Sequence, residues 1–191
     1  MFKSKIRDLL FSFNLFFLKL KFKNLKLGYN VSIDKKTNIV IGNNSCVVSD
    51  NVVLRSNEKG YQAGMPFATT ILIDVTGASV FIGENSRLNG VYVHAQTSIK
   101  IGKNCVIAAG VNIMDSNGHV LASTNRTVGR DIPKAIVIGD NVWIGLNATI
   151  LKGTILGDNS VVSASSVVKG VFPKNSIITG NPGVIIDILN Y

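Results

Sequence analysis

Only two histidines occur in this sequence of 191 residues, and one of them, His119, ends the stretch "DSNGH". Histidine suits proton transfer at neutral pH because its unperturbed pKa is about 6.5, so a histidine held on a loop is a candidate general base. A second group must orient the ring, and Asp115 or a local carbonyl could do so. The other histidine, His94, could assist at an acceptor site or fill a structural position.

The sequence around these histidines repeats every six residues. The longest run of aliphatic residues with this spacing is Ile138, Ile144, Ile150, Leu156, Val162 and Val168. Shorter runs are Ile41, Val47 and Val53, then Ile82 and Leu88, then Ile101, Ile107 and Ile113. This period is typical of a parallel β-helix, in which three short sides close a triangular coil of about 18 residues. Each aliphatic side chain should point into the prism, and the count from Leu88 predicts that His94 faces inward.

The repeat breaks directly after Ile113. Continuing it would bury three polar residues, His119, Asn125 and Asp131. Burying such groups without partners costs several kilocalories, so the chain should leave the prism. We therefore expect a loop over residues 114–135, and loops of about twenty residues in compact domains are commonly functional.

Positive charge is concentrated at the N-terminus. The formal net charge is +9, and residues 1–27 hold Asp8 and seven basic residues: Lys3, Lys5, Arg7, Lys19, Lys21, Lys23 and Lys26. Apolar residues recur there at helical spacing: Ile6, Leu9, Leu10, Phe13, Phe16, Phe17 and Leu20. They predict an amphipathic helix, which could dock on its own domain or lie on a lipid surface. A membrane span needs about 20 apolar residues, which are absent, so we expect a cytoplasmic protein with possible peripheral contact at the inner membrane face.

The segment "VIGDNVWIGLNATILKGTILGDNSVVSASSVV", followed by "PKNSIITGNPGVII", resembles the hexapeptide-repeat acyltransferases, which have a left-handed β-helix. It is most similar to the galactoside, maltose and polysaccharide O-acetyltransferases. The resemblance covers residues 27–186 and implies the handedness, which the period alone does not give. Ser163 and Ser165 depart from the family pattern, in which glycine is usual, and Gly170 stands where a lysine often follows the last coil.

The resemblance implies acyl transfer from the thioester of acetyl-CoA, without a metal, at sites between the subunits of a homotrimer. His119 matches the catalytic base of the family, and its loop would project toward a neighbouring subunit. Asn89 and His94 are the candidates for binding the acceptor. A further set of residues is implied as coenzyme-binding: Trp143, Ala164, Ser165, Lys169 and Lys174.

We therefore expect an acetyl-CoA-dependent O-acetyltransferase that acts on a sugar hydroxyl of a surface polysaccharide, such as an O-antigen or capsule, or of its precursor. An alternative that uses similar acetyl-transfer chemistry is an N-acetyltransferase for a nucleotide-linked amino sugar. A zinc enzyme of the β-helical carbonic anhydrase type would need three protein ligands, for which two histidines and the separated Cys46 and Cys105 offer no suitable spacing. A scaffold without activity would leave the loop histidine unexplained, and nothing but charge suggests nucleic-acid binding.

The predicted organisation is a single all-β domain with short additions. Residues 1–26 form the basic amphipathic segment, residues 27–186 the β-helix with its loop at 114–135, and residues 187–191 a tail. Cys46 and Cys105 are expected to be small buried thiols in a reducing compartment.

Overall fold

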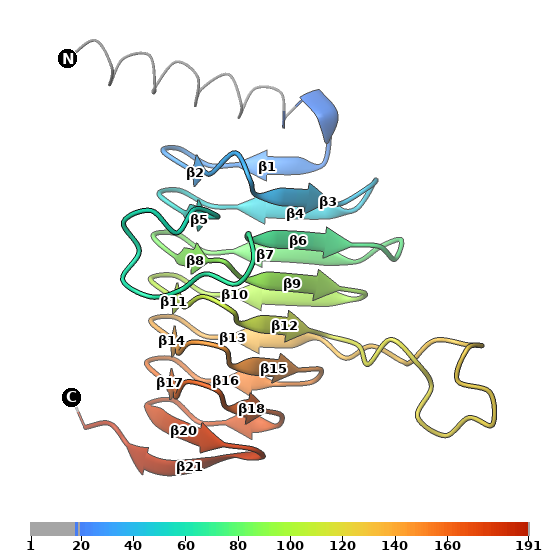
Figure 1. Cartoon of the computed structure of the whole chain (residues 1–191), viewed down its shortest axis with the longest axis vertical. Helices are drawn as coiled ribbons and strands as arrows, with labels where there is room; N and C mark the ends of the chain where they lie inside the picture. The colour runs from blue at the N-terminus through green and yellow to red at the C-terminus, as the bar shows by residue number, and fades with distance from the viewer. Residues whose placement is uncertain (1–17, 19, 191) are drawn as a thin grey trace.

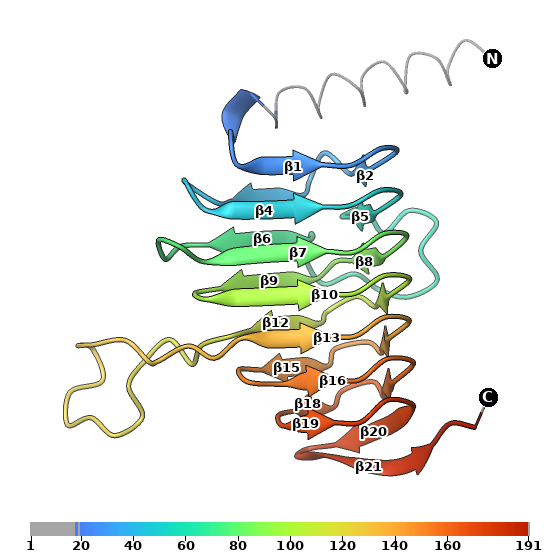
Figure 2. The same ribbon diagram turned by 180° about the vertical axis from the view of Figure 1, so that it is seen from behind.

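A computed structural model of the chain describes residues 18 and 20–190. In this part the chain winds into a triangular prism of three parallel sheets, as Figures 1 and 2 show from opposite sides. The chain passes through sheets A, B and C in turn, so each of the first six coils contributes one strand to each sheet. Only the last pair, β20 and β21, is antiparallel among the strand pairs of the described residues.

The three sheets have the following strands. Sheet A holds β1 (Leu25–Leu27), β4 (Ser45–Val48), β7 (Ser79–Ile82), β10 (Ser98–Ile101), β13 (Ile136–Ile138), β16 (Ile155–Leu156) and β19 (Val171–Phe172). Sheet B holds β2 (Ser32–Ile33), β5 (Val53–Arg55), β8 (Arg87–Asn89), β11 (Val106–Ile107), β14 (Trp143–Ile144), β17 (Val161–Val162), β20 (Ser176–Gly180) and β21 (Gly183–Ile188). Sheet C holds β3 (Asn38–Val40), β6 (Thr70–Ile73), β9 (Tyr92–Ala95), β12 (Asn112–Met114), β15 (Thr149–Leu151) and β18 (Val167–Val168).

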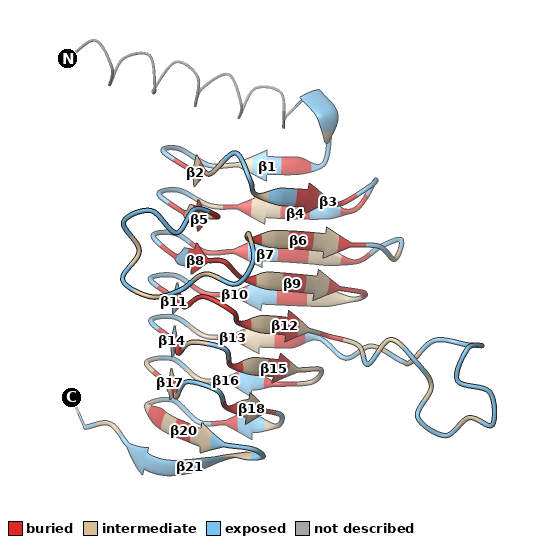
Figure 3. Ribbon diagram, in the orientation of Figure 1, coloured by how far each residue is buried: buried red, intermediate tan, exposed pale blue. Residues whose placement is uncertain are grey.

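The six-residue spacing sets the core of the C-terminal coils. All six aliphatic residues from Ile138 to Val168 are at most 1% exposed. The small residues between them are also buried: Ala148, Thr154, Ser160 and Ser166. Each aliphatic side chain stacks in register on its neighbours, as Ile113 and Ile150 do in sheet C. The predicted all-β parallel β-helix is therefore confirmed, and Figure 3 shows the buried residues running along its strands.

In the N-terminal coils the predicted register is wrong by one residue. Val47 and Val53 face outward, and the buried positions are Cys46, Val48, Val52 and Leu54. The same error affects His94, which faces outward between the buried residues Val93 and Ala95. Side chains alternate along a strand, so one residue gained or lost at a corner exchanges the two faces. For His94 that corner is Gly90, which has a positive φ of 58°.

Three edges join the sheets: edge AB follows the strands of sheet A, edge BC those of sheet B and edge CA those of sheet C. Asparagines with positive φ turn the chain at edge AB: Asn30, Asn51, Asn85, Asn104, Asn141, Asn159 and Asn175. Their side-chain amides bond from coil to coil, as Asn51 Nδ2 does to Asn85 Oδ1 at 3.1 Å. Asparagine tolerates this left-handed conformation better than most residues, which explains its use at these corners.

Two loops leave the prism at different edges (Figures 1 and 2). Loop 115–135 leaves edge CA between β12 and β13 and projects away from the body. Loop 56–69 joins β5 to β6 and lies along edge BC, where Tyr61 Oη accepts a hydrogen bond from the Ala109 N–H at 3.2 Å. Only the first of these loops was predicted.

A helical turn leads into the N-terminal end of the prism, where Leu18 and Phe22 pack against the core. The rest of the predicted amphipathic helix, residues 1–17 and 19, lies outside the described residues. No helix among the residues that the structure describes is long and apolar enough to cross a membrane.

Candidate active site

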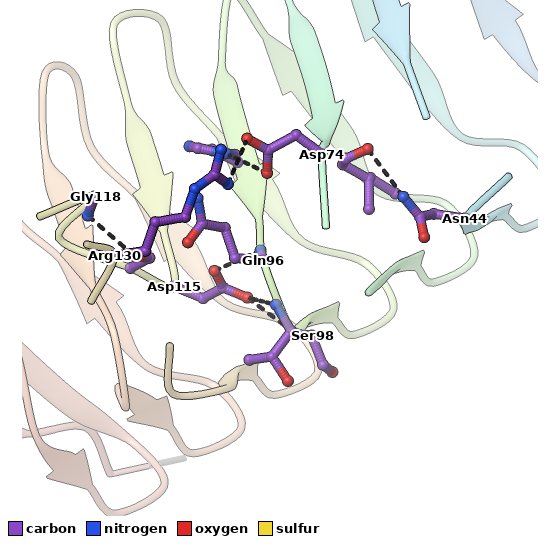
Figure 4. A network of polar contacts seen from close by, with 11 residues as sticks. Asn44, Asp74, Gln96, Ser98, Asp115, Gly118 and Arg130 are labelled. Carbon is purple, nitrogen blue, oxygen red and sulfur yellow. Dashed lines mark hydrogen bonds and ion pairs between the residues drawn. The ribbon is translucent and has the colours of Figure 1, made fainter. Parts of the chain in front are cut away.

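Asp115 fixes the point at which the chain leaves the prism. Its side chain is buried, and its carboxylate accepts hydrogen bonds from the backbone N–H groups of Gln96 (2.7 Å), Thr97 (2.8 Å) and Ser98 (2.9 Å), as Figure 4 shows. These residues form the corner of the preceding coil at edge CA. A carboxylate that accepts several N–H bonds forms strong, charge-assisted contacts. The Asp115 oxygens are thus bonded to the backbone of residues 96–98, and the orientation of His119 by Asp115 or by a local carbonyl stays a prediction.

The two ends of loop 115–135 are tied together at its base, which we call the neck. The Lys134 N–H donates to the Asp115 carbonyl at 2.8 Å, and the Asn117 N–H donates to Asp131 Oδ2 at 2.9 Å. Lys152, which follows β15 in the prism, donates from Nζ to Asp131 and to the Ile132 carbonyl, the latter at 3.1 Å. The Gly153 N–H also donates to the Lys134 carbonyl at 3.0 Å, so the neck is fixed to the body of the prism by Lys152 and Gly153 as well as by Asp115.

The pair at the neck is well shielded from solvent. The Lys152 and Asp131 side chains are 11% and 9% exposed. The hydrogen bond from Lys152, with that from the Asn117 N–H, lowers the pKa of the Asp131 carboxyl below its ordinary value. Asp131 is thus a carboxylate at neutral pH, which keeps the ion pair formed.

His119 lies two residues beyond the neck, in an exposed position. Gly118 precedes it with φ at +80°, and the Gly118 N–H donates to Ser116 Oγ at 3.0 Å. A residue with a side chain would be strained at this φ, whereas glycine is not. The tight turn at residues 115–118 therefore presents the imidazole to solvent from a fixed base.

His94 belongs to the same edge of the prism, on the outer face of β9. Its Nε2 lies 3.0 Å from Asp74 Oδ1, and Arg130 of loop 115–135 reaches the other oxygen of Asp74 at 3.9 Å. Figure 4 shows Arg130 extending from the loop toward Asp74. The structure thus connects His94 to the loop through Asp74. The roles of Asp74, Arg130 and Lys152 could not be predicted from the sequence, because ion pairs between residues this far apart leave no local signal.

Asn89, by contrast, lies at the end of β8, where edge BC begins, and is 7% exposed. Its Nδ2 donates to the Ile107 carbonyl at 3.0 Å, which ties two coils together. The structure therefore does not place Asn89 in an open acceptor site.

Trp143, Ala164 and Ser165 lie on sheet B or at edge BC. Trp143 is 56% exposed on β14, in register with Val106 and Val161 of the adjacent coils. Ala164 and Ser165 form the next corner, and both are exposed. Ser165 adopts a positive φ of 60° where the family usually has glycine.

The two lysines that were predicted to meet the coenzyme lie at other edges. Lys169 is at edge CA and Lys174 is at edge AB, and both are exposed.

A glycine brings two coils close together at this corner. A Cβ added to Gly145 would lie 2.6 Å from the Ala164 nitrogen, so only glycine fits without a backbone shift. The exposed corner at Ala164 and Ser165, which follows the strand paired with Trp143, suits a long, flexible thioester arm such as that of coenzyme A.

The predicted residues therefore fall into two main groups on opposite sides of sheet C. His119 and His94 lie at edge CA, whereas Trp143, Ala164 and Ser165 lie on or beside sheet B. Along one coil, the chain takes five residues from Gly110 at edge BC to Asp115 at edge CA, which corresponds to about 16 Å in a β-strand. One copy of the chain does not bring the two groups together.

The described residues offer little support for a cysteine nucleophile or for a metal site. Both cysteines are buried thiols, and burial raises the pKa of Cys46 to about 12 and raises that of Cys105. A thiol with a raised pKa is a poor nucleophile. Within residues 18 and 20–190, no group of three or more His, Cys, Asp or Glu side chains is placed to hold a metal ion.

Comparison with known proteins agrees with this architecture. Residues 76–114 and 135–169 match the family described as the hexapeptide repeat of succinyl-transferase, so the two matched ranges flank the projecting loop. The chain is 38% identical over 130 residues to a protein of Escherichia coli K12 provisionally named as a lipopolysaccharide biosynthesis O-acetyl transferase, covering 62% of this chain and 66% of that protein. It is 34% identical over 115 residues to the galactoside O-acetyltransferase of the same strain, covering 60% of this chain and 56% of the enzyme. The alignments thus span between half and two thirds of these relatives.

Solved structures share the fold. A galactoside acetyltransferase in complex with coenzyme A superposes with a TM-score of 0.53 at 25% identity, covering 86% of this chain and 65% of that one. The prism is thus a left-handed parallel β-helix of hexapeptide repeats. The chain belongs to the hexapeptide-repeat acyltransferase family, as its sequence predicted.

Proposed function

We propose that this protein is an acetyl-CoA-dependent O-acetyltransferase whose acceptor is a sugar hydroxyl of a surface polysaccharide or of its precursor. The observation that carries the proposal is the neck, which presents the exposed His119 from a base held by Asp115, Asp131 and Lys152. Two relatives, named for lipopolysaccharide biosynthesis and for galactosides, support a sugar acceptor.

In this proposal His119 acts as the general base. A sugar hydroxyl is a weak nucleophile at neutral pH, and acetyl-CoA supplies the acetyl group as an activated thioester. His119 accepts the hydroxyl proton as the acceptor oxygen bonds to the acetyl carbon, and it returns that proton to the departing thiolate sulfur. Such general base catalysis contributes about 10²- to 10⁴-fold to the rate.

The active site is completed by a second copy of the chain. Because His119 lies at edge CA and Trp143, Ala164 and Ser165 lie on or beside sheet B, a neighbour must bring one group to the other. A head-to-tail contact between the two edges, repeated around an axis, closes a ring, and we propose a homotrimer. The exposed indole of Trp143 suits such an interface.

The coenzyme would lie in this shared groove, with its pantetheine arm along Trp143, Ala164 and Ser165. Lys169 and Lys174 would meet its phosphates from other edges, as point charges. We place the protein in the cytoplasm, where reduced thiols such as Cys46 and Cys105 persist.

The test is acetyl transfer to a panel of oligosaccharides and amino sugars, followed by mass spectrometry. His119→Ala should lower kcat by about 10²- to 10⁴-fold with the fold intact. Thr124→Ala, in the same loop, is the matched control and should keep normal turnover. Normal turnover in His119→Ala would refute the assignment of the base. Mild hydroxylamine cleaves an ester and leaves an amide, so a resistant product would favour the N-acetyltransferase alternative.

A further inference from the structure

Positive charge gathers at the end of the prism where the chain enters it. Among the described residues, residues 20–36 contain five lysines and one Asp, a net +4, whereas residues 37–190 contain eleven basic and nine acidic side chains, a net +2. In the described part, the lysines at this end are all exposed: Lys21, Lys23, Lys26, Lys35 and Lys36. The excess charge is therefore a local surface property and not a property of the whole molecule.

The same end also exposes apolar side chains. Leu18 and Phe22 are four residues apart in the helical turn and pack against the core, so this turn is fixed to the prism. Leu20 lies between them and is 62% exposed, beside the exposed Lys21. Tyr29, at the first corner, is 80% exposed. Basic and apolar groups side by side are typical of surfaces that bind anionic lipid.

The opposite end of the prism carries less positive charge. Strand β21 exposes apolar residues there, namely Val184, Ile185, Ile186 and Ile188, but its one charged residue is Asp187. The same end also carries the exposed Lys169 and Lys174, so residues 169–190 have a net charge of +1, against +4 for residues 20–36. The amount of charge therefore distinguishes the two ends, and it selects the N-terminal one for an anionic partner. A nucleic acid would use the lysines but would not account for the exposed Leu20.

We propose that the N-terminal end of the prism, formed by the exposed Leu20, Lys21, Lys23, Lys26, Tyr29, Lys35 and Lys36, docks on an anionic lipid bilayer. The lysines lie at the end of the prism and not along one side, so the long axis stands upright on the membrane. Loop 115–135 leaves between the fourth and fifth coils, and coils are spaced by about 4.8 Å, so the neck stands about 17 Å from the first coil.

The distance of the neck from the membrane limits which acceptors His119 could reach, an inference that rests on the proposed function. An acceptor attached to a lipid would present to His119 a sugar separated from the headgroups by about that distance. A glycan carried on a membrane lipid fits this geometry, whereas a sugar placed directly at the headgroup level does not.

The test uses the full chain and flotation with vesicles. We expect binding to vesicles of phosphatidylcholine and phosphatidylglycerol, weak binding to phosphatidylcholine alone, and release at high salt. The triple variant Lys21→Gln, Lys23→Gln, Lys26→Gln should bind the anionic vesicles about 100-fold more weakly, since each lysine near such a surface contributes roughly fivefold. The matched control replaces three exposed lysines elsewhere: Lys59→Gln, Lys100→Gln and Lys103→Gln.

Equal loss in both triple variants, or equal binding to neutral and anionic vesicles, would overturn the docking surface. If an oligonucleotide at equal charge concentration displaced the vesicles, the docking surface would also be overturned, and the N-terminal end of the prism would be assigned to nucleic-acid binding. Both triple variants should acetylate a soluble acceptor at the wild-type rate. Loss of vesicle binding with activity retained would thus leave the proposed function standing, and inactivity of the wild type with vesicle binding intact would leave the docking surface standing.

Discussion

Lys152 Nζ donates both to the Asp131 carboxylate and to the Ile132 carbonyl, so one side chain from the third side of a coil holds the returning end of the loop that carries His119. Asp131 in turn accepts the N–H of Asn117, two residues before the histidine. Lys152 and Asp131 thus connect the prism to Asn117, close in sequence to the proposed base. In the proposed mechanism these residues touch no reacting atom, so we expect them to position His119.

Removing the cation should therefore slow catalysis without weakening coenzyme binding. In Lys152→Met, Asp131 loses its partner, the neck loosens and His119 spends less time in a productive position. We expect kcat to fall about tenfold, which corresponds to about 1.4 kcal/mol, with KM for acetyl-CoA unchanged. Steady-state kinetics with both substrates provides the measurement.

Two further variants separate positioning from general damage. Lys152→Arg keeps the charge and should restore most of kcat, whereas Lys103→Met removes an exposed lysine at edge AB and should change nothing. A fall in thermal stability with unchanged kcat would show that Lys152 supports the fold alone.

The pH dependence follows from the lowered pKa of Asp131. A carboxyl with a depressed folded-state pKa contributes stability above its unfolded pKa, about 3.9, and loses that contribution as the pH falls through the lower folded value. The neck should thus stay closed above about pH 5 and open as the Asp131 carboxyl is protonated at lower pH. Asp131→Asn removes this carboxylate, so we expect the ratio of wild-type to variant kcat/KM to be constant above about pH 5 and to fall toward one below about pH 4. A ratio that does not change with pH would contradict a role of the ion pair in catalysis.

The regular half of the fold could be predicted because its signal is local and repeated. From Ile138 to Val168 every hexapeptide has the same length, so each aliphatic residue confirms the register of the last. Where coils vary in length, as around Gly90, the count loses one residue and Val93 replaces His94 in the core. Loop 56–69 was missed for a related reason. The run that ended at Val53 had already lost its register, so its interruption could not be recognised.

The site was predicted in part. His119 was singled out because a histidine cannot follow the repeat into an apolar prism, and the structure does place it outside. Asp115 was named as one of two groups that could orient the imidazole, whereas in the structure its carboxylate is bonded to the backbone of residues 96–98. The contacts that fix the loop, such as Lys152 with Asp131, join residues 21 positions apart across a corner. Only the folded chain reveals such pairs.

Asp115 should make a large contribution to stability. Its carboxylate is buried and accepts three backbone N–H bonds, and hydrogen bonds to charged groups contribute about 1.5 to 3 kcal/mol each. We expect Asp115→Ala to lower the free energy of unfolding by about 3 to 5 kcal/mol, measured by urea denaturation. Asp140→Ala is the matched control, because Asp140 Oδ1 accepts the Lys103 N–H at 2.8 Å in an exposed corner. A similar cost for both variants would contradict the anchoring role of Asp115.

The close approach of two coils at Gly145 allows a test of the proposed coenzyme groove. In Gly145→Ala the new methyl group would lie 2.6 Å from the Ala164 nitrogen and 3.0 Å from its Cα, both of them backbone atoms that can move only with the corner. We expect a loss of about 1 to 3 kcal/mol in stability, together with a raised Kd for coenzyme A in calorimetry, because Ala164 and Ser165 are displaced. Gly64→Ala is the control, since a Cβ there meets no atom within 4 Å. If Gly145→Ala loses stability but binds coenzyme A as tightly as wild type, the corner at Ala164 is structural and the pantetheine arm lies elsewhere.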